Sequence, residues 1–306
     1  MLDIILTNMK TNLELYKVFY ETASLQSVTA AAEKLFITQP AVSQSIKNLE
    51  ESLGTALFVR KPRGMELTKA GSTLFQYVSQ AYALLEKGEQ HLRELGDLGT
   101  GEFIISAGDT ICRHILLPII ERFHHQYPGI QVRVTNRTTT ETVKLLKDGR
   151  ADLGILALPL RDGSLEYVEI MKVRDCFICG EKYRDKIKQP ASLEEISKYP
   201  LLLLESGTIT RKTQDEQFGV KGLQMAPEIE LGSLDLLVEF AKIGLGIACV
   251  PREFFLKQIK NKEVYEIELD SPLPTRSFAA ARHRSVPQTG AGAAFMRLLK
   301  EYLPPA

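Results

Sequence analysis

The chain has 306 residues, of which 44% are hydrophobic and 25% charged, and its formal net charge is zero. The length favours two units over a single domain, and the composition is that of a globular protein, which excludes a disordered or fibrous chain. Because the net charge is zero, any case for nucleic-acid binding has to rest on a local group of residues.

The N-terminus and the cysteines both indicate a cytoplasmic protein. MLDIILTNMKTNLEL has no long apolar run with a cleavage site, so we expect no secretory signal, membrane span or membrane partner. Cys176 and Cys179 form a C-x-x-C within RDCFICG, which reads as a strand. Residues three apart on a strand point to opposite faces, so we expect buried free thiols in a reducing compartment rather than a metal site or a redox pair.

Residues 11–66 read as three helices and a small ribbon. The first helix is indicated by four apolar positions, Leu13, Val18, Phe19 and Ala23. The second, at 27–36, is short and rich in Ala, which allows close approach of another helix. The third has Thr38 as its expected N-cap, Pro40 in its first turn and Gly54 at its end.

The third helix has two unlike faces. On a helical wheel one face groups Val42, Ile46, Leu49 and Leu53, which we expect in the core. The other face carries Gln39, Ser43, Gln44 and Lys47. Such short hydrogen-bonding groups can read base edges in a major groove, and the helix N-terminus can hold a phosphate.

The ribbon LFVRKPRGMELT turns at PRG, where Arg60, Lys61 and Arg63 lie within four residues. A basic hairpin beside a reading helix suits phosphates or the minor groove. A solvated turn is the alternative for the tip taken alone.

Residues 68–95 contain no Pro and predict a helix about 40 Å long. Apolar or small residues recur at steps of four and three along it: Leu74, Val78, Ala81, Leu85, Gly88, Leu92 and Leu95. We refer to these residues as the seam. We expect the seam to form a two-chain coiled coil, the alternative being a helix packed on its own domain.

After the glycine-rich joint GDLGTG (96–101), strand and helix patterns alternate to the end of the chain. Alternation of this kind predicts parallel strands with crossover helices, and the overall class is therefore α/β.

The run AAAEKLFITQPAVSQSIKNLEESLGTALFVRKPRGMELTKAG resembles the winged helix-turn-helix of LysR-type transcriptional regulators. Family members share its Ala-rich helix, Thr-Gln-Pro-Ala-Val-Ser, Leu-Glu-x-x-Leu-Gly, Leu-Phe-x-Arg and Leu-Thr-x-Ala-Gly. The resemblance continues more weakly over the whole length. It implies a winged helix-turn-helix at 9–67, a linker helix at 68–95, and a two-lobed α/β effector domain at 96–306 like periplasmic binding proteins. Lobe I would comprise about 96–173 and 275–306, and lobe II about 174–274.

The resemblance also implies which residues contact DNA: Gln39, Pro40, Ser43, Gln44 and Lys47 as reading positions, Thr29 and Thr38 nearby, and Arg60 and Arg63 in the wing. Many relatives carry Arg where this chain has Gln44. Gln is shorter and uncharged, so the base preference at that position stays open.

Three strand-to-helix junctions in the α/β region carry polar residues, and open parallel sheets bind ligands at such junctions. They are ISAGDTI with Gly108, Asp109 and Thr110, TNRTTTETV with Thr138 and Thr139, and LESGTITR with Thr208. Hydroxyls and free N–H groups at helix starts favour small anions, although each residue alone could be a simple N-cap. In the family these loops line the effector cleft, so an organic acid or an amino-acid-like metabolite is the expected ligand; no other cofactor and no metal is expected.

Asp109 departs from the Ser or Thr that relatives often carry, and its charge would repel a carboxylate. Either it caps its own helix or it pairs with a cation on the ligand, which leaves an amine-bearing effector open. Arg137 and Arg211 could supply positive charge to the cleft or could be structural.

We therefore expect a cytoplasmic, non-enzymatic regulator of transcription that binds double-stranded promoter DNA and a small effector. It would dimerise through the linker helix and pair further into a tetramer, with RNA polymerase as a further candidate partner. The alternatives are a solute-binding sensor and a metabolic enzyme, but no G-x-S-x-G, phosphate-binding glycine loop or H-E-x-x-H is present.

Overall fold

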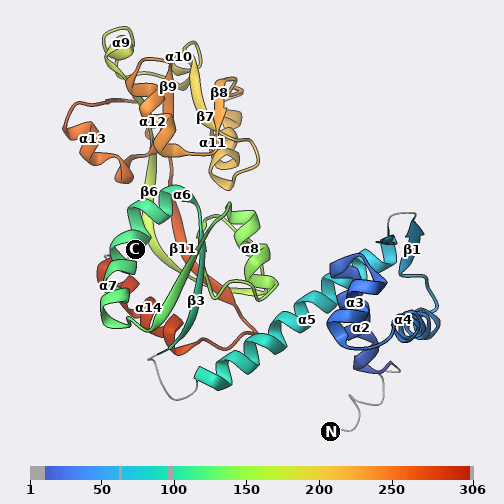
Figure 1. Cartoon of the computed structure of the whole chain (residues 1–306). Helices are drawn as coiled ribbons and strands as arrows, with labels where there is room; N and C mark the ends of the chain where they lie inside the picture. Colours follow the sequence, from blue (N-terminus) through green and yellow to red (C-terminus); the bar gives the residue numbers. More distant parts are fainter. Residues whose placement is uncertain (1–10, 62–63, 95–99, 304–306) are drawn as a thin grey trace. The chain divides into compact units, whose positions relative to one another are not determined.

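The computed structural model describes residues 11–61, 64–94 and 100–303 (Figure 1). The chain divides into two compact units, Met1–Glu89 and Gln90–Ala306.

The first unit consists of helices packed beside a two-stranded hairpin. Its elements are α2 (Leu13–Leu25), α3 (Val28–Leu35), α4 (Gln39–Leu53), β1 (Phe58–Lys61), β2 (Gly64–Leu67) and the long α5 (Lys69–Glu94). Strands β1 and β2 pair antiparallel, with Val59 opposite Glu66. These are the three helices, ribbon and long helix that the sequence predicts.

Local chemistry fixes the ends of α4 as expected. The Thr38 hydroxyl accepts a hydrogen bond from the Ala41 N–H, and Gly54 adopts a left-handed conformation (φ 67°) at the C-cap. Val42, Ile46 and Leu49 are buried, but Leu53 is 39% exposed. The prediction that Leu53 lies on the core face was therefore wrong, because this last helical residue sits where the chain leaves the helix.

Helix α5 changes character along its length. In its first half Leu74, Phe75, Val78 and Tyr82 pack into a cluster with Phe19, Leu49 and Leu57 of the same unit. In its second half Leu85 and Leu92 are 63% and 69% exposed in the single chain. The predicted seam is thus split: its start packs on its own domain, and Leu85 to Leu92 stays open. Leu95 lies outside the described residues.

The second unit is built on one continuous sheet. Its strands are β3 (Gly101–Ala107), β4 (Ile130–Asn136), β5 (Leu153–Ala157), β6 (Leu165–Cys179), β7 (Leu201–Leu204), β8 (Pro227–Leu231), β9 (Ile247–Pro251), β10 (Tyr265–Ile267) and β11 (Thr275–His283). Their order is β4-β3-β5-β11-β6-β9-β7-β8, with β10 also paired to β6.

Helical segments connect and cover these strands. They are α6 (Asp109–Ile111), the π-helix η1 (Cys112–Leu116), α7 (Leu117–Gln126), α8 (Thr139–Lys147), α9 (Glu181–Arg184), α10 (Leu193–Ile196), α11 (Ile209–Val220), α12 (Leu234–Lys242), the 3-10 helix η2 (Arg252–Phe254), α13 (Leu256–Lys260) and α14 (Gly290–Tyr302).

Strand β6 divides the sheet into two lobes. It pairs with β11 from Leu165 to Arg174 and with β9 from Asp175 to Cys179. We call β3, β4, β5, β11 and their helices lobe I, and β7 to β10 with their helices lobe II. Strand β3 runs parallel to β4 and β5, and β7 runs parallel to β8 and β9, which confirms the predicted α/β class.

The two cysteines of the C-x-x-C lie on opposite faces of β6. Cys176 belongs to the large core cluster shared by both lobes, and Cys179 to the separate lobe II cluster. The predicted alternation is confirmed. Within the described ranges, no helix is long and apolar enough to cross a membrane, and no group of three or more His, Cys, Asp or Glu residues could hold a metal.

Candidate functional site

Helix α4 presents a polar face to solvent, opposite its buried side. Of the predicted DNA-contacting residues, Thr38, Gln39, Pro40, Gln44 and Lys47 are exposed and Ser43 is half-buried. Thr29 is exposed on the neighbouring helix α3. This face contributes nothing to the core, so its side chains are free to meet another surface.

The turn between α3 and α4 is held tightly. Ala31 and Ala32 are buried between the helices, and Phe36 caps α3 in a left-handed conformation (φ 56°). The Ile37 N–H donates to the Ala32 carbonyl at 3.0 Å. The Phe36 ring is nevertheless 95% exposed. This exposed ring was not predicted from the sequence. The signal for it would have been an aromatic residue in a turn too short to bury its side chain.

The polar face is only loosely tied to its own helix. The Gln44 amide donates to the Asn48 side-chain oxygen at 2.7 Å, and Lys47 Nζ lies 3.6 Å from Glu51 Oε1. Both side chains of that ion pair are well exposed, and such pairs contribute about 0–1 kcal/mol. A stronger anion can therefore take Lys47 from Glu51.

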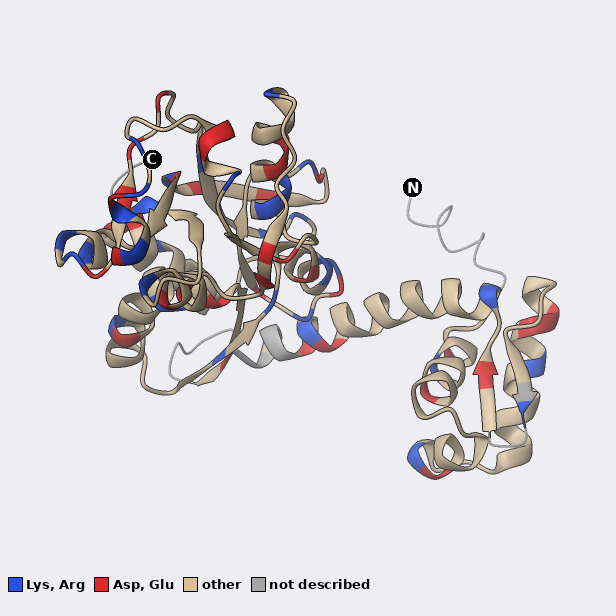
Figure 2. Cartoon of the chain, turned by 90° about the horizontal axis from the view of Figure 1, so that it is seen from above, with Lys and Arg blue, Asp and Glu red and all other residues tan. Residues whose placement is uncertain are grey.

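The basic hairpin is β1–β2. Lys61 pairs with Glu66 across it, with a Lys61 Nζ to Glu66 Oε2 distance of 3.1 Å. Arg60 is part of β1, and Arg63 lies outside the described residues. Figure 2 shows acidic and basic residues interspersed over the chain, in keeping with its zero net charge.

The second unit contains a cavity of about 430 Å³ between its two lobes. All six residues predicted for the effector site line it: Gly108, Asp109, Thr110, Thr138, Thr139 and Thr208. The three predicted junctions, which follow β3, β4 and β7, thus converge on one site. The parallel strand order explains this, because the carboxyl ends of parallel strands meet at one edge.

Three of these hydroxyls are used by the fold itself. Thr138 forms a capping box with Glu141, and the hydrogen bonds from the Thr138 N–H and hydroxyl lower the pKa of Glu141. The Thr139 hydroxyl accepts from the Ala157 N–H at 3.1 Å, and the Thr208 hydroxyl accepts from the Arg211 N–H at 3.1 Å. Thr138 and Thr208 are thus N-caps, which is the alternative that the sequence left open, whereas Thr139 ties α8 to β5.

Asp109 does not cap its helix. Gly108 occupies the N-cap position of α6, without a side-chain hydrogen bond. The Asp109 carboxylate instead accepts from Asn136 Nδ2 in lobe I and from Ser233 Oγ in lobe II, both at 3.3 Å. Asp109 therefore bridges the two lobes at the cavity, and the suggestion that its charge is used as an N-cap was wrong.

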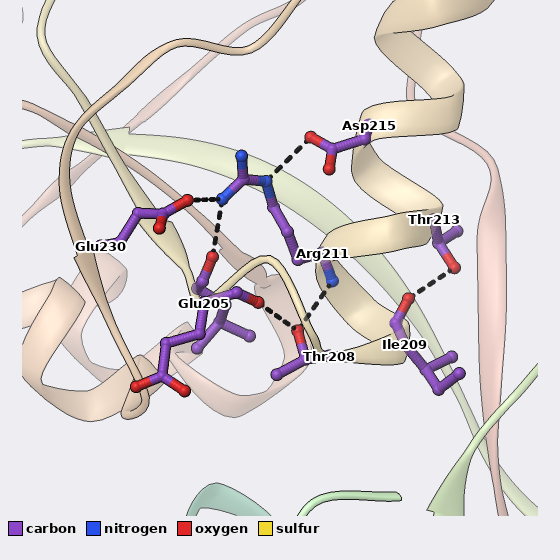
Figure 3. A network of polar contacts seen from close by, with 8 residues as sticks. Glu205, Thr208, Ile209, Arg211, Thr213, Asp215 and Glu230 are labelled. Atoms are coloured by element: carbon purple, nitrogen blue, oxygen red, sulfur yellow. Dashed lines mark hydrogen bonds and ion pairs between the residues drawn. The ribbon is translucent and has the colours of Figure 1, made fainter. Parts of the chain in front are cut away.

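Of the two arginines considered for the cleft, Arg137 lines the cavity and Arg211 does not. Figure 3 shows Arg211 in a network with Asp215, Glu230 and the loop before α11. Its Nη1 also donates to the Leu204 carbonyl at 2.8 Å, and its side chain is buried. Arg211 thus positions the start of α11 and is not available to a ligand.

Two families of known sequences match the chain. The family described as "LysR substrate binding domain" matches residues 96–304, and the one described as "Bacterial regulatory helix-turn-helix protein, lysR family" matches residues 13–72. The chain belongs to the LysR family. It is a transcriptional regulator with a helix-turn-helix DNA-binding domain and a LysR substrate-binding domain.

LysR-family relatives cover nearly the whole chain. The HTH-type transcriptional regulator CysL of Bacillus subtilis is 26% identical over 258 residues, which are 84% of this chain and 86% of CysL. A full-length OxyR variant of Pseudomonas aeruginosa is similar in structure, with a TM-score of 0.67 at 20% identity over 96% of this chain and 95% of that one. Full-length CbnR complexed with its target DNA has a TM-score of 0.63 at 19% identity, over 95% and 99%. The two structural similarities show the LysR-type fold.

Three cysteines of this LysR-family chain, Cys176, Cys179 and Cys249, are buried, and Cys112 is half-buried. Burial raises the pKa of Cys112 and of Cys179 to about 11, and it also raises the pKa of Cys176 and of Cys249. The reactive thiolate form is therefore disfavoured at neutral pH.

Several lining residues of the cavity escaped sequence analysis. They are Asn136, Glu141, Thr210, Ser233, Phe254 and Phe278, together with Gly232 and further apolar residues. Ser233 caps α12 and could have been found by the N-cap signal that marked Thr138. Phe254 and Phe278 carry no local signal, because only the strand order brings η2 and β11 to this edge.

Proposed function

We propose that α4 enters the major groove of promoter DNA, with Gln39, Pro40, Ser43, Gln44 and Lys47 as reading positions. Thr29 and Thr38 lie near the DNA, beside these reading positions, and Arg60 and Arg63 of the hairpin contact phosphates or the minor groove. The exposed polar face of α4, opposite Val42, Ile46 and Leu49, is the observation that carries the proposal.

Replacing Lys47 tests the reading face. In Lys47→Ala we expect about tenfold weaker binding to a duplex selected by the wild-type protein from a random pool, because one charged contact is lost. Fluorescence anisotropy at several salt concentrations also reports the salt slope, which should fall by about one if Lys47 contacts a phosphate.

Lys300→Ala is the matched control, because it removes the same charge from an exposed position on α14 of the second unit. It should bind DNA as the wild type does. Full-strength binding by Lys47→Ala, with its helical circular dichroism unchanged, would rule out Lys47 as a reading residue.

We further propose that the protein acts in the cytoplasm as a homodimer joined through the open half of the seam, and as a tetramer by additional pairing of the second unit. Support comes from Leu85 and Leu92, which are exposed apolar residues one heptad apart on α5. The cytoplasmic location is proposed because the partner is DNA. RNA polymerase is the candidate partner through which the bound protein would affect transcription.

The cavity between the lobes is proposed as the effector site. It is large enough for a small metabolite, combines apolar walls with a few polar groups, and is bordered by six residues that the sequence singled out.

The Thr110 hydroxyl tests this assignment. In Thr110→Ala we expect unchanged DNA affinity and a blunted response to effector, measured as the effector-dependent shift in DNA affinity or in promoter output. A Thr110→Ala protein with a wild-type response would remove this residue from the effector site, whereas lost DNA binding would indicate a folding defect.

A further inference from the structure

The charges around the cavity do not suit a purely acidic ligand. Among the lining residues Asp109 and Glu141 are acidic and Arg137 is basic, so the wall carries one excess negative charge. Arg137 Nη1 already donates to the Asn136 carbonyl at 2.7 Å. Arg211 of α11 is held by Asp215 and Glu230, and Arg113 and His114 of η1 are held by Asp235.

The carboxylate of Asp109 is the group best placed to bind a cation. Its two hydrogen-bond donors, Asn136 and Ser233, are neutral and lie at 3.3 Å, which is long for a bond to a carboxylate. No Lys, Arg or His pairs with it within the part of the chain that the structure describes. Glu141 differs, because it accepts from the Thr138 N–H at 2.9 Å and the Thr138 hydroxyl at 2.8 Å.

Two hydroxyls of the cavity wall offer hydrogen bonds to an anionic group. Thr110 in lobe I and Thr210 in lobe II are 7% and 8% exposed, and both line the cavity. Neither hydroxyl has a hydrogen-bond partner among the described residues. Since both residues line the cavity, these hydroxyls are free to donate to a ligand bound there. Thr210 also lies in the first turn of α11, where free N–H groups and the helix dipole favour a negative charge.

The rest of the wall is apolar. It includes Ile111, Ile155, Leu204, Leu234, Phe254 and Phe278, with the two phenylalanine rings 5.6 Å apart. A cavity of about 430 Å³ leaves room for a short hydrocarbon side chain beside two charged groups.

We propose that the ligand of this cavity is a small amino acid with an apolar side chain. Its ammonium group binds the Asp109 carboxylate, its carboxylate binds the hydroxyls of Thr110 and Thr210, and its side chain packs against Phe254 and Phe278. The inference rests on the proposed function of the cavity as an effector site and specifies the chemical class of the effector.

Matched probes test the class directly. Isothermal titration of the full-length protein compares L-leucine and L-phenylalanine with 4-methylpentanoate and 3-phenylpropanoate, which lack the amine, and with isopentylamine and phenethylamine, which lack the carboxylate. We expect at least one amino acid to bind, and both of its truncated analogues to bind at least tenfold more weakly.

Two variants separate Asp109 from negative charge in general. Asp109→Asn should weaken amino-acid binding at least tenfold, because the ammonium loses its counter-charge. Glu141→Gln removes the other carboxylate of the wall, and Gln at this position still completes a capping box, so its effect should stay within threefold.

The contrary results are equally specific. If no amino acid of the panel binds, if the amine-free acids bind as tightly, or if Asp109→Asn binds like the wild type, the amino-acid assignment is wrong. DNA affinity measured on the same proteins keeps the two ideas apart. Promoter binding that responds to an amine-free acid would preserve the proposed function and overturn the ligand class, whereas an inability to bind any selected duplex would overturn the proposed function.

Discussion

At the scale of single residues, a buried ion pair holds the junction between the two lobes. Arg276 of β11 donates from Nε and Nη2 to both carboxylate oxygens of Asp175 of β6, at 2.9 and 3.0 Å. The two side chains are 3% and 0% exposed. Asp175 is the residue at which β6 exchanges its partner β11 for β9, and Arg276 also lies over the ring of Phe278, which lines the cavity. The pair thus holds β6 and β11 together at the point where the chain passes from one lobe to the other.

Breaking this pair should destabilise the second unit. In Arg276→Met the Asp175 carboxylate stays buried without a counter-charge, and we expect the free energy of unfolding to fall by about 3–5 kcal/mol. Urea unfolding measures the change. The double variant Arg276→Met with Asp175→Leu removes both charges and should recover most of the loss. A single variant within about 1 kcal/mol of the wild type would show that the pair does not hold the junction.

At the scale of elements, α5 shows how one helix serves two purposes. Its first half is covered by stacked aromatic side chains, with Tyr20 and Phe75 centroids 5.8 Å apart and Tyr20 and Tyr82 centroids 5.0 Å apart. Its second half has apolar residues, Leu85 and Leu92, that stay exposed in the single chain. A heptad pattern in the sequence cannot distinguish these halves, because packing on the same chain and packing on a partner bury the same positions.

The open half of α5 makes a prediction about assembly. Leu85→Glu with Leu92→Glu places like charges along the proposed contact, so we expect the wild-type oligomer to dissociate in sedimentation velocity. Tyr77→Glu is the control, because Tyr77 is an exposed apolar residue of the same helix outside the seam. An unchanged mass in the double variant would place the dimer contact elsewhere.

Element positions followed well from sequence because their signals are local. Thr38, Thr138 and Thr208 each cap the helix expected after them. The cavity was harder to predict, because only part of its wall lies at strand-to-helix junctions that can be read along the chain, and one of these, Ser233 before α12, was missed. Phe254 and Phe278 reach the cavity only through the strand order. Whether Arg211 faces a ligand could not be predicted either, because it binds Glu230, which is 19 residues away in the sequence.

At the scale of the whole molecule, the cavity lies where the lobes are bridged. Asp109 accepts from Ser233 across it, and Asp235 of α12 meets both Arg113 at 3.1 Å and His114 at 3.2 Å. Strand β6 runs through both lobes, and β11 begins beside the point where β6 passes into lobe II. We propose that these two strands form a hinge between the lobes. A ligand that binds Asp109 therefore acts on a contact between the lobes. We propose that closure of the two lobes around a bound ligand changes the spacing of the DNA-binding units in the oligomer.

The central claim is that the exposed face of α4 reads the major groove. Methylation protection by dimethyl sulfate tests it most directly, because this reagent modifies guanine N7 in the major groove and adenine N3 in the minor groove. We predict that the wild-type protein protects guanine N7 positions within its selected site, and that Lys47→Ala or Gln39→Ala loses protection at particular guanines while protection elsewhere persists. Guanine N7 positions that stay reactive throughout the bound site, or protection that is identical in all three proteins, would contradict the account.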